Sequence, residues 1–162
     1  MKEKSQRLMF DYLSQNKIEN FIGVPDSTMK YFIEQGLQEK KILITTREDE
    51  AIGIAAGMYL SNSSSLVFMQ NAGFANSLST ITSLIQLYKI PIILLIGWRG
   101  YLKKDAPEHS KIGKIQPKLI RILGLDFKVL TDTNWKKCSM WALNKIKKEI
   151  PCALIIKREF TD

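Results

Sequence analysis

Short apolar runs alternate along the chain with longer segments in which apolar residues recur every three or four positions. The short runs predict buried strands at 21–24, 42–45, 66–70, 90–97, 127–131 and 152–157. The longer segments predict helices at about 5–16, 28–39, 48–61, 74–88, 114–124 and 134–149. Strands that alternate with helices form a mainly parallel sheet covered on both faces, so we expect a three-layer α/β/α domain with six strands.

Length and composition are consistent with one domain over residues 1–162, since 45% of the chain is hydrophobic and 25% is charged. The longest apolar run, IPIILLIGW, has about half the length of a membrane span, and the N-terminal residues lack a signal-peptide pattern. We therefore expect a cytoplasmic protein that does not enter a membrane. Cys138 and Cys152 lack the spacing of a metal site or a disulfide framework, so we interpret them as core or surface thiols and expect no metal ligands.

The net charge of +8 admits three kinds of partner: a nucleic acid, an anionic small ligand or an acidic protein. The lysines are spread along the chain and do not form one stripe interleaved with aromatic residues. This distribution favours a solvated surface, and we expect no nucleic acid. A non-catalytic basic binding module stays open as an alternative of another class.

Ligands of parallel α/β sheets bind where strands end and helices begin. Four such turns carry glycine or proline together with polar groups; they read GVPDS (23–27), TTRED (45–49), QNAGFAN (70–76) and GWRGYLKKDAPEH (97–109). The last turn is long for a strand-to-helix connection, which is typical of functional loops. Common nucleotide, zinc-protease and hydrolase motifs are missing from the sequence, so a conventional dinucleotide-binding domain is not expected.

Taken in order, four segments resemble the pyrimidine-binding domain of thiamin-diphosphate-dependent 2-oxoacid decarboxylases. They are GVPDS, REDEAIGIAAGMYL, MQNAGFANSLSTITSL followed by YKIPIILLIGWRG, and DAPEHSKIGK. The resemblance extends from about residue 5 to residue 157. It implies the fold of that domain, thiamin diphosphate as cofactor and an anionic 2-oxoacid as substrate. The implied reaction is first the conversion of phosphonopyruvate to phosphonoacetaldehyde and CO2, with sulfopyruvate as the alternative substrate.

Members of this family also need a second domain that holds the diphosphate through Mg2+, marked by a GDG motif and a later asparagine. The sequence contains no such segment. The resemblance therefore implies an alpha subunit whose partner, a beta subunit, carries the diphosphate-binding domain and the Mg2+ site. We expect a hetero-oligomer with its active site between the chains.

Glu48 precedes the helix glycine Gly57 by nine positions, which is the spacing of the family's essential glutamate. The resemblance implies that Glu48 hydrogen-bonds the aminopyrimidine ring and favours the imino tautomer, which can remove the thiazolium carbon proton. An alternative needs no cofactor: Glu48, Asp49 and Glu50 complement the dipole at the start of a helix.

Gly53 and Gly57 lie four residues apart, so they share one face of the predicted helix, with Ala56 beside them. Glycine in a helix interior costs roughly 1 kcal/mol relative to alanine, which indicates a compensating close approach. The resemblance implies that this helix contacts the partner subunit. Tight packing on the domain's own sheet is the alternative.

His109 is the only histidine, and a histidine in a polar loop is often a solvated surface residue. The resemblance instead implies proton transfer during decarboxylation or aldehyde release. The family's glutamine at the preceding position is replaced by Glu108, whose role stays unassigned. Asp26 suits a helix N-cap with Ser27 or Thr28, and the resemblance implies that it also acts with the histidine on the reaction intermediate.

Arg99 is suited to binding a phosphonate or carboxylate through two hydrogen bonds, and Lys103 and Lys104 follow on the same turn. Stacking of Arg99 on Trp98 is the alternative. The remaining candidates are substrate-binding Ser27 and Asn71, and cofactor-binding Gln70, Asn71 and Gly73.

Overall fold

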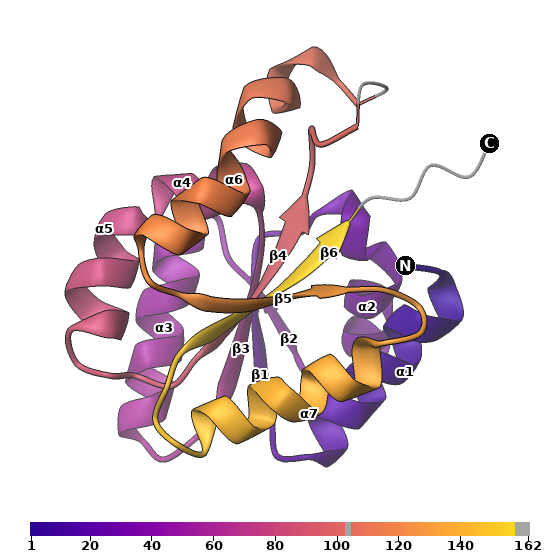
Figure 1. Ribbon diagram of the computed structural model, residues 1–162. Coiled ribbons are helices and arrows are strands. Elements are labelled where there is room, and N and C mark those ends of the chain that lie inside the picture. Colours follow the sequence, from indigo (N-terminus) through magenta and orange to yellow (C-terminus); the bar gives the residue numbers. More distant parts are fainter. Residues whose placement is uncertain (103–104, 158–162) are drawn as a thin grey trace.

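A computed structural model describes residues 1–102 and 105–157, and it contains one six-stranded sheet with strand order β2-β1-β3-β4-β6-β5 (Figure 1). All five strand pairs are parallel. The strands are β1 (Asn20–Gly23), β2 (Ile42–Ile44), β3 (Ser65–Gln70), β4 (Ile93–Trp98), β5 (Asp126–Leu130) and β6 (Cys152–Lys157). Each overlaps a predicted strand, so the α/β class and the six strands are confirmed.

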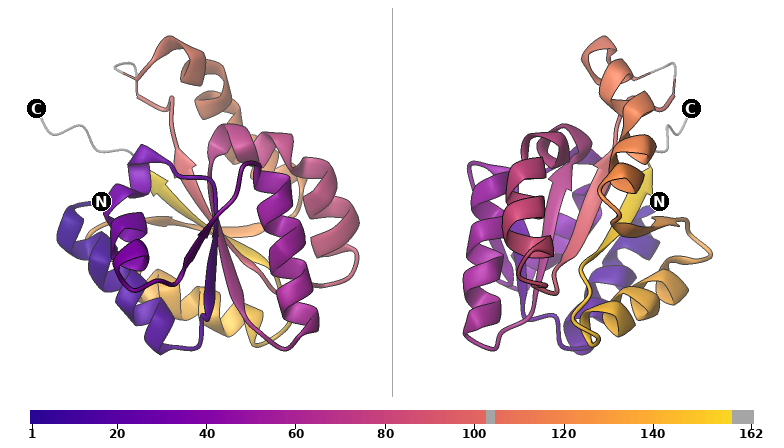
Figure 2. Two further views of the ribbon diagram at one scale, coloured as in Figure 1. Left: turned by 180° about the vertical axis from the view of Figure 1, so that it is seen from behind. Right: turned by 60° about the vertical axis from the view of Figure 1, so that its left-hand side comes forward.

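Helices cover both faces of the sheet (Figures 1 and 2). One face carries α1 (Glu3–Gln15), the 3₁₀ turn η1 (Ser27–Met29), α2 (Lys30–Gln38) and α7 (Trp135–Ile146). The other carries α3 (Glu48–Leu60), α4 (Asn71–Asn76), α5 (Leu78–Thr80), the π-helical turn η2 (Ile81–Gln86) and α6 (Ser110–Ile122). The 3₁₀ turn η3 (Pro107–His109) leads into α6. The result is the predicted three-layer domain.

Two apolar cores lie on the two sides of the sheet because successive strand residues point to opposite faces. On β3, Leu66 and Phe68 pack toward α1 and α2, whereas Val67 and Met69 pack toward α3. All of these side chains are fully buried. A strand that is covered on both faces needs apolar residues at every position, which is why the strands are visible as continuous apolar runs in the sequence.

Two predicted helices differ from the structure. The segment predicted at 74–88 begins earlier, at Asn71, is interrupted at Ser77 and ends in η2. The Ser77 hydroxyl donates to the Gly73 carbonyl at 2.9 Å, and Ser83 donates to the Ser79 carbonyl at 2.6 Å. Such bonds from serine to carbonyls of the preceding turn compete with regular helix geometry. The helix predicted at 114–124 starts at Ser110, because η3 leads directly into it.

Both cysteines are free and buried, as expected for core thiols. Burial raises the pKa of the Cys152 thiol to about 12 and also raises the pKa of Cys138. In the part of the chain that the structure describes, no helix has the length and apolar character needed to cross a membrane.

The carboxyl ends of the strands form one edge of the sheet. From β1 the chain adds β2 on one side and the later strands on the other side, so the connections reverse direction between β1 and β3. Such a reversal opens a crevice in which ligands of parallel sheets bind. Figure 2 shows the turn after β4 and the first part of α6 extending beyond this edge. These segments therefore stand next to the crevice.

Candidate functional site

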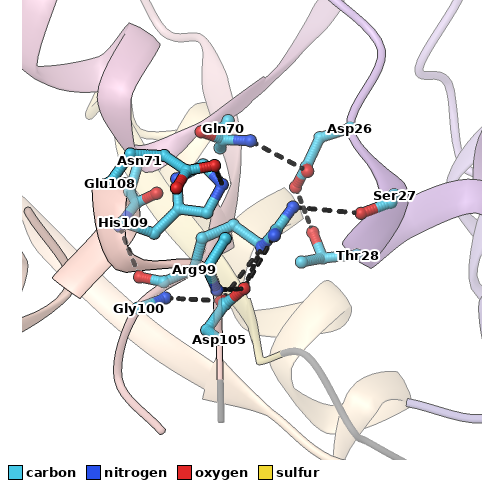
Figure 3. A network of polar contacts seen from close by, with 11 residues as sticks. Asp26, Ser27, Thr28, Gln70, Asn71, Arg99, Gly100, Asp105, Glu108 and His109 are labelled. Carbon is cyan, nitrogen blue, oxygen red and sulfur yellow. Dashed lines mark hydrogen bonds and ion pairs between the residues drawn. The ribbon is translucent and has the colours of Figure 1, made fainter. Parts of the chain in front are cut away.

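Three neighbouring strands deliver polar side chains to the crevice (Figure 3). Asp26 and Ser27 follow β1, Gln70 ends β3, Asn71 begins α4, and Arg99 follows β4. The structure thus brings together residues that lie far apart in the sequence, as the strand-end argument predicts.

Asp26 is almost completely buried, with 5% of its surface exposed. Its carboxylate accepts a hydrogen bond from Gln70 Nε2 at 3.3 Å and another from the hydroxyl of Thr28. A Cβ at Gly97 of β4 would overlap the Asp26 carboxylate and the Thr28 hydroxyl, so this strand position has room only for glycine. Asp26 holds the N-cap position of η1, but its side chain binds Thr28 Oγ1 and Gln70 in place of a backbone N–H. Its orientation is consequently fixed by side chains.

Arg99 and Asp105 form an ion pair in which their side chains are only 11% and 2% exposed. Arg99 Nε lies 3.0 Å and Nη2 lies 2.7 Å from carboxylate oxygens of Asp105. The backbone N–H groups of Gly100 and Ala106 donate to the same carboxylate at 2.7 and 2.9 Å. The Arg99 guanidinium, helped by these two amides, holds the pKa of Asp105 far below its ordinary value of 3.8.

The guanidinium of Arg99 points from this ion pair toward the turn after β1, where its Nη1 lies 3.3 Å from Ser27 Oγ (Figure 3). The alternative in which Arg99 stacks on Trp98 is not what the structure contains. The cation over the Trp98 ring is Lys157, with its Nζ 5.1 Å from the ring centroid. Sequence analysis missed Asp105, although an aspartate in the same long turn as the arginine was a visible signal.

His109 ends η3 and has 16% of its side chain exposed. Its Nε2 lies 3.9 Å from a carboxylate oxygen of Glu108, which is itself 70% exposed. Gly100, at φ +75°, lies directly against the His109 carbonyl. Among the described residues no hydrogen bond joins His109 to Asp26, so their predicted joint action has no direct link within this chain.

Asn71 is completely buried, and its Nδ2 donates to the Arg99 carbonyl at 2.9 Å. Its Oδ1 has no hydrogen-bond partner within the described residues. A buried acceptor without a partner costs free energy, so it needs an explanation such as a ligand group that donates to it. The role of Asn71 in binding cofactor or substrate stays a prediction.

Glu48 begins α3 and is half-buried. Its carboxyl group lies against Gly73 of α4, where a Cβ would overlap it. Glu48 is the first of three consecutive acids, here called the acidic triad, and the two others have different partners. Asp49 pairs with Arg47 at 2.9 Å, and Glu50 accepts from the Thr46 N–H at 3.1 Å. These two residues thus interact at the helix start, whereas Glu48 alone turns toward the β3–α4 junction.

Gly53 and Gly57 are exposed, and a Cβ on either would meet nothing within 4 Å. The buried face of α3 is formed by other residues, among them Ile52 and Ala55. The alternative in which the two glycines pack on the domain's own sheet is therefore wrong. The interface with a second chain stays a prediction.

Lys103 and Lys104 lie outside the described residues. Within the described ranges, no group of three or more histidine, cysteine, aspartate or glutamate side chains is arranged to hold a metal ion.

A parallel α/β domain with polar side chains gathered at the strand ends belongs to the class of proteins that bind a small ligand in that crevice. Residues 4–118 match the family model described as thiamine pyrophosphate enzyme, N-terminal TPP binding domain. The chain belongs to this family.

Named relatives agree with the family assignment. A sulfopyruvate decarboxylase subunit alpha of Methanocaldococcus jannaschii is 34% identical over 70% of this chain and 69% of its own length. The subunit of the same name from Methanococcus maripaludis is 34% identical over 65% of this chain and 64% of its own length. A phosphonopyruvate decarboxylase of Streptomyces hygroscopicus is 31% identical over 68% of this chain, which corresponds to 28% of its own length.

Two solved structures share the fold at low sequence identity. Benzoylformate decarboxylase from Polynucleobacter necessarius superposes with a TM-score of 0.77 over 98% of this chain and 31% of its own, at 16% identity. A 2-oxoglutarate:ferredoxin oxidoreductase from Magnetococcus marinus gives a TM-score of 0.73 over 97% of this chain and 29% of its own, at 13% identity. The family match and the named relatives leave the alternative of a non-catalytic basic module without support.

Proposed function

We propose that this chain is the alpha subunit of a thiamine-pyrophosphate-dependent 2-oxoacid decarboxylase. One observation carries the proposal: the turns that resemble the family lie at one edge of the sheet, and the Glu48 carboxyl group lies against Gly73. These turns are far apart in the sequence, and the family match over residues 4–118 supports the interpretation that together they form one cofactor site.

The residues at the β3–α4 junction fit the pyrimidine end of the cofactor. Glu48 supplies a carboxyl group, which can lie close to α4 because Gly73 has no Cβ. Asn71 Oδ1 supplies a buried acceptor. When bound, thiamine pyrophosphate provides a carbon nucleophile and an electron sink for loss of carboxylate. In this proposal Glu48 holds a proton at the pyrimidine. Gln70 orients Asp26 through the hydrogen bond that it donates to the carboxylate.

The substrate end of the site lies at Ser27 and Arg99 in this proposal. The Arg99 guanidinium and the Ser27 hydroxyl can donate hydrogen bonds to an anionic group of the substrate. His109 and Asp26 lie on either side of Arg99 (Figure 3), and we assign to them the exchange of protons with the substrate carbon after carboxylate leaves.

We propose that the substrate is a pyruvate with a second anionic group on its methyl carbon. The sequence resemblance places phosphonopyruvate first. The relatives whose length is similar to that of this chain are named sulfopyruvate decarboxylase subunit alpha, which keeps sulfopyruvate as the second candidate.

A beta subunit that holds the diphosphate through Mg2+ completes the proposed enzyme. The exposed glycine face of α3, Gly53 and Gly57, allows a second backbone to approach closely. Glu48 begins the same helix but turns toward Gly73 of α4, whereas both glycines face outward. A partner docked on the glycine face would therefore pack beside the helix that carries Glu48.

Reconstitution tests the function directly. The chain is co-expressed with a candidate beta subunit and assayed with thiamine pyrophosphate, Mg2+ and each of the two 2-oxoacids. We expect CO2 and the corresponding aldehyde from at least one substrate, and the ratio of the two kcat/KM values identifies it. Absence of CO2 from both substrates with an assembled pair would refute the proposal.

Glu48→Gln tests the assigned role of this carboxyl group. We expect kcat of the reconstituted pair to fall by at least about 100-fold, the usual contribution of a positioned acid or base, with the fold of the chain unchanged by circular dichroism. Glu50→Gln is the matched control, because Glu50 lies in the same acidic triad and binds the Thr46 N–H. Unchanged turnover in Glu48→Gln would contradict the role.

A further inference from the structure

Asp105 makes contacts that a surface carboxylate does not make. It binds Arg99 through two guanidinium nitrogens and accepts from the N–H groups of Gly100 and Ala106 (Figure 3). Its side chain is 2% exposed, so these contacts are shielded from water. Both ends of the turn that links Arg99 to η3 are therefore held by one carboxylate.

The arrangement of the hydrogen-bond donors shows how Asp105 constrains the orientation of Arg99. A guanidinium offers five N–H groups in a rigid plane, with one edge formed by Nε and Nη2 and another by Nη1 and Nη2. Asp105 occupies the first edge. The second edge is left to point toward Ser27 at the crevice, with Nη1 at 3.3 Å from the hydroxyl.

We propose that Asp105 is the positioning residue that directs the outer edge of Arg99 toward the anionic group of the substrate. The proposal rests on the function proposed above and assigns a new residue to the same site. Asp105 acts through Arg99 and does not itself touch the substrate. A donor fork whose direction is already set loses less side-chain entropy when the anion binds.

The same carboxylate also positions the backbone that carries His109. The amides of Gly100 and Ala106 are fixed on it, and Gly100 lies against the His109 carbonyl. A purely structural role for Asp105 would act through this backbone, whereas the proposed role acts through the guanidinium. The two roles make different kinetic predictions.

The kinetic test uses Asp105→Asn in the reconstituted pair, with Arg99→Lys as the background variant. Asparagine keeps the size of the side chain but loses the charge that holds the guanidinium edge. We expect KM for the 2-oxoacid to rise roughly tenfold or more, with a much smaller change in kcat. In Arg99→Lys, which cannot present a planar fork, Asp105→Asn should add little to KM. An equal KM effect in both backgrounds would overturn the proposal in favour of a structural role.

A second measurement does not depend on activity. In the full chain alone, the Arg99 Nε proton should exchange slowly with water in an NMR experiment, because it is held by a buried carboxylate. Asp105→Asn should abolish this protection, and Arg99→Lys identifies the resonance. A rapidly exchanging Nε proton in the unmodified chain would overturn the proposed orientation. A pair that releases no CO2 would refute the proposed function, and the exchange rate would still decide whether Asp105 orients Arg99.

Discussion

Two glycines define the site at the scale of single residues. A Cβ at Gly73 would overlap the Glu48 carboxyl group, and a Cβ at Gly97 would overlap the carboxylate of Asp26. Each glycine comes from a different element than the acid it accommodates. The positions of the two acids thus depend on a glycine, which has no Cβ, in a neighbouring helix or strand.

Gly73→Ala separates activity from stability. The overlapping atoms belong to the flexible side chain of Glu48, which can move, and alanine favours a helix relative to glycine. We expect the thermal unfolding temperature to change by only a few degrees while kcat of the reconstituted pair falls at least about tenfold. In a Glu48→Gln background the alanine should have no further effect on kcat; an additional fall would show that Gly73 acts on something other than Glu48.

Among the helices and strands, α3 has one buried face and one exposed face made of small residues. Its buried residues, including Ala51 and Ala55, pack on the sheet, whereas Gly53 and Gly57 face outward with open space around them. A solitary exposed helix would be more stable with alanine at both positions. The glycines therefore lower the stability of the isolated chain, and a docked partner is the compensation that we propose.

Replacing both glycines, Gly53→Ala with Gly57→Ala, should raise the stability of the chain alone by about 1 to 2 kcal/mol in urea unfolding. The two methyl groups should also weaken association with the beta subunit, measured by sedimentation of the mixture. Asn144→Ala is the control, because it improves helix propensity at an exposed position of α7 on the opposite face of the sheet. Undiminished association in the double variant would exclude this face as the interface.

At the scale of the whole molecule, the buried ion pair couples the stability of the fold to pH. The pKa of Asp105 is lowered in the folded chain, so the unfolded chain takes up a proton first as the solution is acidified. The contribution of Asp105 is fully present well above its ordinary pKa of 3.8 and is lost as the pH falls toward the lower pKa of the folded state. The loss therefore begins below about pH 5.

Urea unfolding at a series of pH values between 5 and 3 measures this coupling. We expect the free energy of unfolding of the unmodified chain to fall more steeply with acidification than that of Asp105→Asn. The comparison cancels the contributions of the other carboxylates, which both proteins share. Parallel curves for the two proteins would mean that Asp105 has no lowered pKa in the folded state.

Strand positions were predictable because both faces of this sheet are covered. The predicted segment 152–157 coincides with β6, and the helix predicted from residue 48 begins at Glu48. The break at Ser77 was not predicted, because it depends on whether the hydroxyl binds a carbonyl of the preceding turn or faces water. Periodicity contains no information on that choice.

Among the candidate site residues, those directly at strand ends were predicted from the sequence to lie at one edge of the sheet, and the structure brings Asp26, Ser27, Gln70, Asn71 and Arg99 together there. Asp105 was missed because its contacts arise from the path of a long turn, which local sequence does not determine. The pairing of Glu48 with Gly73 had no signal in the sequence, since it requires the relative placement of α3 and α4.

The sequence by itself determined the six strands, the helices between them and the edge at which polar residues gather, because burial on two faces dictates an apolar pattern and parallel strands share one carboxyl edge. Only the tertiary structure decided which way Arg99 points, which acid of the triad turns toward the site, and that Gly53 and Gly57 face solvent. These properties depend on distances between side chains of different elements, and such distances exist only once the layers have packed.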